Sequence, residues 1–284
     1  MSIFSAVLLG VIQGLTEFLP ISSTAHLTLA AKLMGLITSE TAEAWTEFVA
    51  IIQLGTLLAV IVYFLTDLQT MLLSIWRDAK VLLTEHRMLN FSTETRLGVY
   101  LILGTVPIGI AGLFLSKFIH GMFTKSTVVI ITSLVGLAVL LWIAEKIASH
   151  ARSLQQLNWR DALVVGIAQA FALIPGSSRS GTTITAGLFL NLSRTAAARF
   201  SFLLSIPAVL ASGLYELMKI SGSVLHFGTL NLVIATAVSA ATGYAAIAWL
   251  LRYLSTHSTF AFVWYRICLG VLLAVLVFFN LLPS

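Results

Sequence analysis

The sequence predicts an all-α integral membrane protein with about six transmembrane helices and two re-entrant helix pairs in an inverted-topology repeat. Three observations lead to this fold class. First, 58% of the 284 residues are hydrophobic and 10% are charged, against roughly 25% charged residues in a typical soluble domain. Second, six apolar runs are long enough to cross a bilayer. Third, two other apolar regions are interrupted by proline, glycine and serine at matching places.

The six apolar runs predict six full spans, because a bilayer core of about 30 Å requires about 20 apolar residues in a helix. Little sequence remains between them, so a single polytopic membrane domain over 1–284 is expected. The formal net charge of +5 is modest, and the expected partner is the lipid bilayer rather than a nucleic acid. The runs lie at roughly 44–66, 97–116, 126–147, 196–219, 228–252 and 260–282.

The two interrupted regions predict re-entrant helix pairs. The first covers about 1–35 and breaks at Pro20, and the second covers about 158–192 and breaks at "IPGSSRSG". Each half of a region is too short to cross the bilayer alone. Non-helical backbone at membrane depth is tolerated only where protein or a water-filled cavity surrounds it, so both breaks are expected to lie inside the protein.

The two interrupted regions also resemble each other, which indicates an internal duplication. "GVIQGLTEFLPISST" matches "GIAQAFALIPGSSRS", and the likeness continues downstream. Pro20 and Pro175 are 155 positions apart, and Phe48 and Phe200 are 152 positions apart. Two repeats over about 1–150 and 151–284 are therefore expected. Interrupted segments at equivalent positions of two halves point to a binding site near the middle of the bilayer.

The loop charges predict the orientation. Ten Lys and Arg residues lie in or near the loops at 67–96, 146–160, 192–200 and 252–259, and four lie on the opposite side. Cytoplasmic loops carry an excess of Lys and Arg, so the first set is expected to face the cytoplasm. The first helix pair then enters from outside and the second from inside, so that their tips can meet.

Four residues at the two breaks carry the chemistry. Gln13 and Glu17 are four positions apart and share one helix face. A glutamate at membrane depth is costly and usually faces an internal cavity. His26 follows the first break, and an imidazole is suited to proton transfer near neutral pH. Arg179 lies in the second break at the expected start of a helix, where a guanidinium and free N–H groups together suit a phosphate.

Together these residues suit hydrolysis of a diphosphate. Arg179 and the N–H groups of its tip would bind the phosphate oxygens, Ser23 or an activated water would attack, and His26 would protonate the leaving group. Glu17, with the side-chain oxygen of Gln13, could hold a divalent cation that bridges the phosphates. The other polar groups expected to bind substrate at the tips are Ser22, Thr24, Gly176, Ser178, Ser180 and Thr183.

Each of these residues also has a simpler interpretation. Glu17 and Arg179 could form an ion pair that only joins the two halves, and His26 could be a packing residue. The hydroxyls could bond to their own helices. The alternative functions are a secondary transporter or flippase for an anionic lipid or small anion, and a purely structural membrane protein. Broken helices in inverted repeats are typical of transporters.

"QGLTEFLPISSTAH" and "PGSSRSGTT" resemble the two signature motifs of the bacterial undecaprenyl-pyrophosphate phosphatase family, which is associated with bacitracin resistance. The first signature is Glu or Gln followed four residues later by Glu, here Gln13 and Glu17. The second signature, P-G-x-S-R-S-x-x-T, is present from Pro175 to Thr183. The resemblance covers most of the chain, including "EFVAIIQLG", "LSRTAAARFSFLLSIP" and "WYR".

The resemblance implies a multi-pass enzyme of the bacterial plasma (inner) membrane, with its active site open to the outer (periplasmic) face. Such enzymes hydrolyse undecaprenyl diphosphate to the monophosphate and inorganic phosphate, which recycles the lipid carrier for peptidoglycan synthesis. The resemblance also implies a supporting Mg²⁺ or Ca²⁺. It assigns essential roles to Glu17, His26 and Arg179, with Ser22 or Ser23 as the nucleophile. The sequence leaves the oligomeric state open, with a homodimer as one option.

Three positions depart from the family pattern. Gln13 takes the Gln option of the first signature, which removes one formal charge from any metal site. Ala25 stands where Gly is expected before the histidine, and Arg199 stands where an acidic residue often precedes "FSFLL". None of the three alters the expected catalytic set, so the first departure bears on metal affinity more than on activity.

Overall fold

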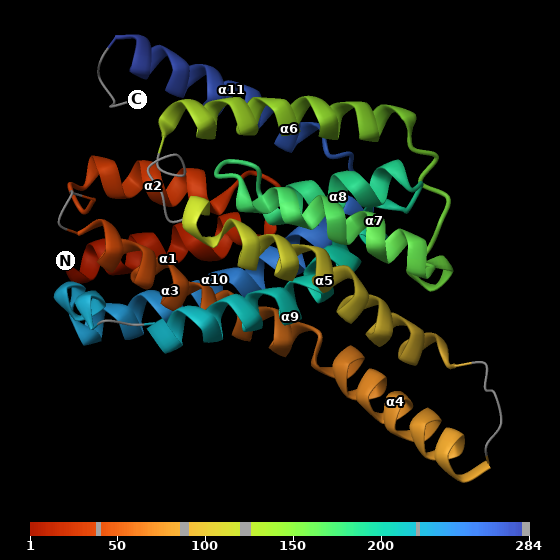
Figure 1. Ribbon diagram of the computed structural model, residues 1–284. Coiled ribbons are helices and arrows are strands. Elements are labelled where there is room, and N and C mark those ends of the chain that lie inside the picture. The colour runs from red at the N-terminus through yellow and green to blue at the C-terminus, as the bar shows by residue number, and fades with distance from the viewer. Residues whose placement is uncertain (38–40, 86–90, 120–125, 220–221, 280–284) are drawn as a thin grey trace.

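The computed structural model describes residues 1–37, 41–85, 91–119, 126–219 and 222–279, and this part of the chain is helical almost throughout (Figure 1). Its β-pairing is confined to one isolated bridge between Arg152 and Leu192. The α-helices are α1 (Ile3–Phe18), α2 (Ser23–Leu33), α3 (Ala42–Tyr63), α4 (Leu65–Glu85), α5 (Thr93–Ile119), α6 (Thr127–Ile147), α7 (Trp159–Ala170), α8 (Arg179–Phe189), α9 (Arg194–Lys219), α10 (Thr229–Leu254) and α11 (Phe260–Phe278). Short 3-10 helices are η2 (Leu154–Gln156), η3 (Phe171–Leu173) and η4 (Ser223–Phe227).

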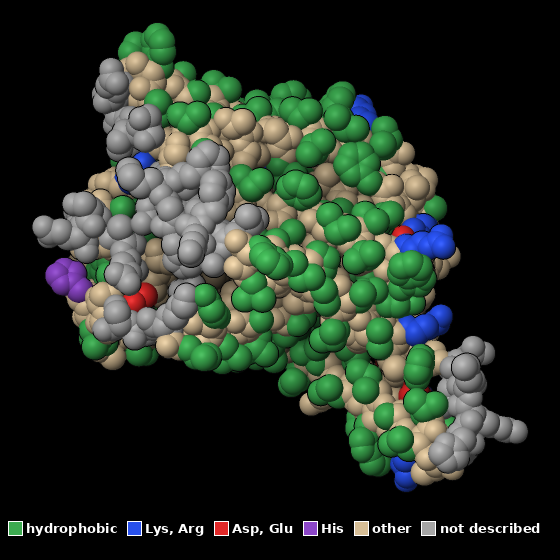
Figure 2. Space-filling view, in the orientation of Figure 1, with side chains coloured by type: hydrophobic (Ala, Val, Ile, Leu, Met, Phe, Trp, Pro, Cys, Tyr) green, Lys and Arg blue, Asp and Glu red, His purple; other side chains and the backbone are tan. Residues whose placement is uncertain are grey.

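Within the described residues, six helices are long and apolar enough to cross a membrane, which confirms the predicted all-α membrane architecture. Hydrophobic side chains are spread over the visible face between the two ends of the bundle (Figure 2). Lys and Arg gather mainly toward the end from which α4 projects. A face so rich in apolar side chains and so poor in charge is suited to lipid rather than to water. The spans are Ala44–Tyr63, Thr93–Phe114, Thr127–Ile147, Arg194–Tyr215, Thr229–Leu254 and Phe260–Phe278.

The segment 67–96 differs from the expectation, because most of it is helix rather than loop. Helix α4 is amphipathic, and charged residues such as Arg77 between its leucines keep it out of the set of candidate spans. Asp78 Oδ2 accepts hydrogen bonds from the backbone N–H and the hydroxyl of Ser92, at 2.9 and 2.8 Å. The pKa of the Asp78 carboxyl is lowered from its usual value, mainly by the hydrogen bond from the Ser92 N–H. This contact ties α4 to the start of α5, and the two project from the bundle together (Figure 1).

Both interrupted regions fold as helix pairs, α1–α2 and α7–α8, with η3 at the end of α7. Helices α1 and α7 begin at Ile3 and Trp159, and α2 and α8 begin at Ser23 and Arg179, so each start recurs after 156 positions. Helix α1 runs inward from the end of the bundle where the N-terminus lies, and α7 runs inward from the opposite end (Figure 1). The two turns that connect the helices of each pair, called the tips below, therefore meet in the interior.

Glycines hold each helix pair close to a long helix of the other half. A Cβ placed on Gly10 of α1 would lie 2.6 Å from the carbonyl oxygen of Ala235 in α10. One placed on Gly166 of α7 would lie 2.8 Å from the Cα of Gly104 in α5. Gly10 and Gly166 are themselves 156 positions apart. Helix association in lipid depends on such close packing, so the two crossings fix both pairs in an equivalent way.

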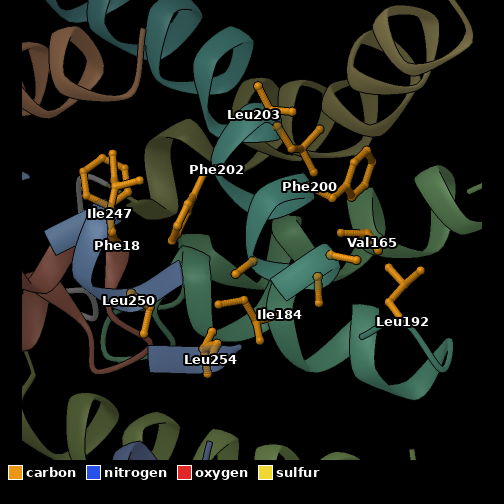
Figure 3. Packing of buried hydrophobic residues seen from close by; sticks show 14 of the residues in the cluster. Phe18, Val165, Ile184, Leu192, Phe200, Phe202, Leu203, Ile247, Leu250 and Leu254 are labelled. Carbon is orange, nitrogen blue, oxygen red and sulfur yellow. The ribbon is translucent and has the colours of Figure 1, made fainter. Parts of the chain in front are cut away.

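The main hydrophobic core includes Phe18 at the inner end of α1 and Ile184 in the middle of α8 (Figure 3). Phe18 of α1 packs edge-on against Phe202 of α9, with ring centroids 5.3 Å apart. Ile184 of α8 and Leu250 of α10 belong to the same fully buried cluster. Because Phe18 precedes the first tip and α8 follows the second, this core holds both tips in place.

Candidate active site

Both tips have the same unusual backbone. Ser22 and Ser178 have φ angles of 76° and 68°, in the left-handed region that residues with a Cβ rarely adopt. The side chain of each serine caps the helix that follows, accepting a hydrogen bond from the N–H of Ala25 or Gly181. A proline shortly before each serine prevents one continuous helix. Each tip therefore presents the N-terminus of a short helix to the interior of the protein.

Glu17 is the centre of the candidate site. Its buried carboxylate accepts hydrogen bonds through Oε2 from Gln13 Nε2 at 3.2 Å and from Ser23 Oγ at 2.8 Å. Its other oxygen, Oε1, accepts from Arg179 Nη2 at 3.0 Å. Four of the residues singled out from the sequence, on α1, α2 and α8, thus lie in direct contact.

Two buried polar atoms of this cluster have no hydrogen-bond partner among the described residues, namely Gln13 Oε1 and Arg179 Nη1. A buried polar group without a partner is costly, so a ligand is the natural partner of both. The free guanidinium donor fits a phosphate oxygen, and the free amide oxygen beside a carboxylate fits a hard divalent cation. The described residues contain no cluster of three His, Cys, Asp or Glu, so a cation here would need oxygens from substrate and water as well.

His26 lies on α2 one turn beyond the first tip, and both of its ring nitrogens have partners. Nδ1 is 2.7 Å from the carbonyl oxygen of Ser22. A carbonyl can only accept, so Nδ1 carries the proton, and Nε2 of the neutral ring accepts from the Tyr265 hydroxyl at 2.6 Å. The two rings are stacked, with centroids 5.6 Å apart and planes 11° apart. Tyr265 is a partner that the tip motifs do not reveal.

Arg266 is the second functional residue that lies outside the tip motifs. Its side chain is fully buried. Nη1 donates to the carbonyl of Pro20 at 3.1 Å, Nη2 to that of Gly176 at 3.0 Å, and Nε to that of Leu134 at 3.0 Å. One guanidinium on α11 therefore ties both tips to α6. An arginine inside the apolar run 260–282 is the sequence signal for such a role, because an intramembrane charge is costly unless it has partners.

The hydroxyls of the second tip bond to backbone and to one another. Ser180 Oγ donates to the carbonyl of Leu19 at 3.0 Å and so joins the two tips. It also lies 3.2 Å from Ser178 Oγ. Thr183 Oγ1 donates to the carbonyl of Arg179 at 2.8 Å. These contacts fix the backbone of the tip that carries Arg179, and the substrate-binding role expected for the hydroxyls stays a prediction.

Gly176 and Thr24 occupy contrasting positions at the two tips. Gly176 has a φ of 88°, and a Cβ there would collide with Ser133 Oγ and the carbonyl of Ile130 on α6. The second tip can therefore approach α6 only with glycine at this position. Thr24, the second residue of α2, is exposed.

A cavity of about 500 Å³ lies elsewhere, between α4, α5, η2 and the start of α9. Its lining includes the ion pair between Arg199 and Asp67, whose closest atoms are 2.9 Å apart. No residue of either tip lines this cavity. The candidate site is therefore identified by the convergence of polar groups at the tips and not by the volume of a cavity.

The family model described as bacitracin resistance protein BacA matches residues 6–272, a stretch that includes both tips. The chain belongs to the BacA family. It is 50% identical to the undecaprenyl-diphosphatase of Syntrophobacter fumaroxidans (strain DSM 10017 / MPOB), over 98% of each chain. It is 48% identical to that of Myxococcus xanthus (strain DK1622), over 97% of this chain and 89% of the relative. The undecaprenyl-diphosphatase of Chloroherpeton thalassium (strain ATCC 35110 / GB-78) is 46% identical over 96% of each chain.

The BacA family resemblance expected from the motifs is thus confirmed, and the three departures from its pattern can be placed. Gln13 contacts Glu17 at the centre of the site. Ala25 is buried in α2, where its N–H bonds to the helix cap. Arg199 pairs with Asp67 at the cavity between α4, α5 and the start of α9, which no residue of either tip lines. Of the three, only Gln13 contacts the carboxylate of the candidate site.

Proposed function

We propose that this protein is an undecaprenyl-diphosphate phosphatase, which hydrolyses undecaprenyl diphosphate to undecaprenyl phosphate and inorganic phosphate. Relatives named undecaprenyl-diphosphatase that align over nearly the whole chain support this function. The observation that carries it is the contact of the Ser23 hydroxyl and the Arg179 guanidinium with the two oxygens of Glu17. That contact joins a nucleophile, a base and an anion-binding group at one place.

In the first step Ser23 is the nucleophile. Its hydroxyl donates to Glu17 Oε2 at 2.8 Å, within the distance that a general base requires. The Ser22 hydroxyl oxygen is engaged in capping α2, which favours Ser23 over its neighbour. Ser23 Oγ attacks the terminal phosphorus, its proton passes to Glu17, and the bond from that phosphorus to the bridging oxygen breaks. Undecaprenyl phosphate leaves, and Arg179 stabilises the charge on the phosphoryl group through its free Nη1.

In the second step a water attacks the phosphoserine. The sequence suggested that His26 protonates the leaving group, but Nδ1 already donates to the carbonyl of Ser22, so Nε2 of the neutral ring carries no proton to give. We therefore assign His26 the role of a base, and Nε2 receives a proton from the water. The bond between phosphorus and Ser23 Oγ breaks, and Glu17 returns its proton to that oxygen. Inorganic phosphate leaves, and the proton on His26 passes to solvent. Both side chains then return to their initial protonation states.

A divalent cation, Mg²⁺ or Ca²⁺, is also proposed to support the reaction. Gln13 Oε1 and the Glu17 carboxylate would hold it, and the cation would neutralise charge on the diphosphate. Arg179 lies 3.0 Å from the carboxylate and Gln13 is uncharged, so the protein itself contributes little to cation affinity. Substrate oxygens and water would supply the remaining ligands.

We further propose that this multi-pass protein lies in the bacterial plasma (inner) membrane and that its halves, about 1–150 and 151–284, have inverted topology. The Lys- and Arg-rich end would face the cytoplasm. The α1–α2 pair would then enter from the periplasmic face, and the site would open to that face. The polyprenyl tail would stay in the bilayer while the diphosphate enters between the tips. The reaction as written requires one protomer, and a homodimer is compatible with it.

The test is phosphate release from undecaprenyl diphosphate by purified protein in detergent. Wild type is expected to release phosphate. We expect the rate to fall about 100-fold or more in each of four variants, Glu17→Ala, Ser23→Ala, His26→Ala and Arg179→Ala. Thr132→Ala on the exposed face of α6 is the control and should retain full activity. Chelation should lower the rate, and added Mg²⁺ or Ca²⁺ should restore it. If wild type releases no phosphate while it transports an anionic substrate across liposomes, the phosphatase assignment is wrong.

A further inference from the structure

The nitrogen of His26 that the second step uses is occupied by Tyr265. The hydroxyl of Tyr265 lies 2.6 Å from Nε2, a short distance for a hydrogen bond between a hydroxyl and a ring nitrogen. The other nitrogen, Nδ1, is engaged by the carbonyl of Ser22 and offers no alternative route for a proton. A proton that moves from water to His26 must therefore pass the phenol oxygen or displace it.

The position of the Tyr265 hydroxyl is fixed from two directions. Its ring stacks on the His26 imidazole, with planes 11° apart. Its neighbour in the chain, Arg266, is fully buried and donates to the carbonyls of Pro20 and Gly176, so the backbone of α11 at this point is tied to both tips. Tyr265 itself is 44% exposed, so the residue is open to a further contact besides His26.

We propose that Tyr265 is a catalytic proton-relay residue between the attacking water and His26. As the water oxygen bonds to the phosphorus, one water proton passes to Tyr265 Oη and the proton of that hydroxyl passes to His26 Nε2. The phenol ends the step with as many protons as it had before, and His26 carries the additional one. The inference rests on the proposed function, since it assigns a route to a proton transfer of that reaction.

Tyr265→Phe removes only the hydroxyl, because it keeps the stacked ring and leaves Arg266 in place. We expect kcat for phosphate release to fall about 100-fold, as for loss of a group in proton transfer, and KM to fall with it, so that kcat/KM, which reports the first step, stays near the wild-type value. The phosphoserine should accumulate on Tyr265→Phe, since only the second step is slowed. Tyr244→Phe is the matched control, because Tyr244 is also 44% exposed and packs against Tyr63 on another helix. It should keep the wild-type kcat.

A double-mutant cycle separates a relay from a packing role. If Tyr265 acts through His26, the double variant with His26→Ala and Tyr265→Phe should be no slower than His26→Ala alone. The thermal midpoint of Tyr265→Phe should stay within about 2 °C of wild type. The relay would be overturned if Tyr265→Phe kept the wild-type kcat. It would also be overturned if Tyr265→Phe lowered kcat by the same factor in the His26→Ala background as in wild type. An inactive wild-type protein would instead refute the phosphatase function itself.

Discussion

At the scale of single residues, Arg266 shows how one buried cation can organise a site between two halves of a chain. Its guanidinium donates to the carbonyls of Pro20 and Gly176, which the helix breaks leave without helical partners, and to the carbonyl of Leu134 in α6. Removing one side of a buried charged contact is strongly destabilising, because the other side remains buried and unpaired. The positive charge of Arg266 lies close to the N-termini of α2 and α8, which are themselves partly positive. The electrostatic field at the tips therefore favours an anion.

Replacing Arg266 with lysine keeps the charge but not the fork of donors. A lysine ammonium cannot reach the carbonyls of Pro20, Gly176 and Leu134 together. We expect Arg266→Lys to lose about 3 kcal/mol or more of stability, together with most of the activity. Thermal unfolding in detergent measures the first and phosphate release the second.

The control for this substitution is Arg252→Lys, at an exposed position in the last turn of α10. This substitution should change the free energy of unfolding by no more than about 0.5 kcal/mol, as is usual for exposed positions. Arg266→Lys with wild-type stability would show that the tips do not depend on this guanidinium.

At the scale of the elements, the close crossings of α1 with α10 and of α7 with α5 set the depth of the tips. Gly166 lies where α7 contacts the backbone of α5 at Gly104, and three residues further along α7 the buried Gln169 side chain follows. A side chain at this crossing forces the helices apart, and α7 leads directly to the tip that carries Arg179. Packing at the crossing and geometry at the site are therefore linked.

Gly166→Ala tests this link. The added Cβ would lie 2.8 Å from Gly104 Cα, so the crossing must open. We expect a loss of about 1 to 3 kcal/mol in stability, as for other overpacked contacts, and a fall in kcat as Arg179 moves from Glu17. Thermal unfolding and phosphate release on the same preparation are the measurements.

Gly136→Ala is the matched control, because a Cβ at this position on α6 meets nothing within 4 Å. The substitution should be neutral or should stabilise α6 by up to about 1 kcal/mol, since alanine is the better helix former. Equal effects of the two substitutions would mean that the α5–α7 crossing is not a tight contact.

At the scale of the whole molecule, hydropathy and the duplicated breaks were enough to predict six spans and two helix pairs. The contact of Glu17 with Arg179 was also expected, because costly polar groups at two matching breaks require partners in a common place. Helix α4 was missed because its charged residues resemble those of a loop. The roles of Tyr265 and Arg266 could not be derived from spacing, because α11 reaches the tips only through tertiary packing about 240 positions after His26.

The orientation across the bilayer can be tested with single cysteines, because the chain has one natural cysteine, Cys268. In a Cys268→Ser background, Gln155→Cys marks η2 at the Lys- and Arg-rich end, and Leu225→Cys marks η4, where the side chain is 59% exposed. A membrane-impermeant maleimide should label Leu225→Cys in intact spheroplasts. It should label Gln155→Cys only after permeabilisation, because that end is expected to face the cytoplasm. The reverse pattern would invert the proposed topology.

The recurrence of the helix pairs after 156 positions has a consequence for the polar groups that each pair carries. Gln169 stands in α7 where Gln13 stands in α1, but Leu173 occupies the position equivalent to Glu17. Likewise Arg179 occupies the position equivalent to Ser23, and both side chains bind the one carboxylate of Glu17. The helical framework is thus repeated while its reactive side chains are not, so the two tips together form one asymmetric centre.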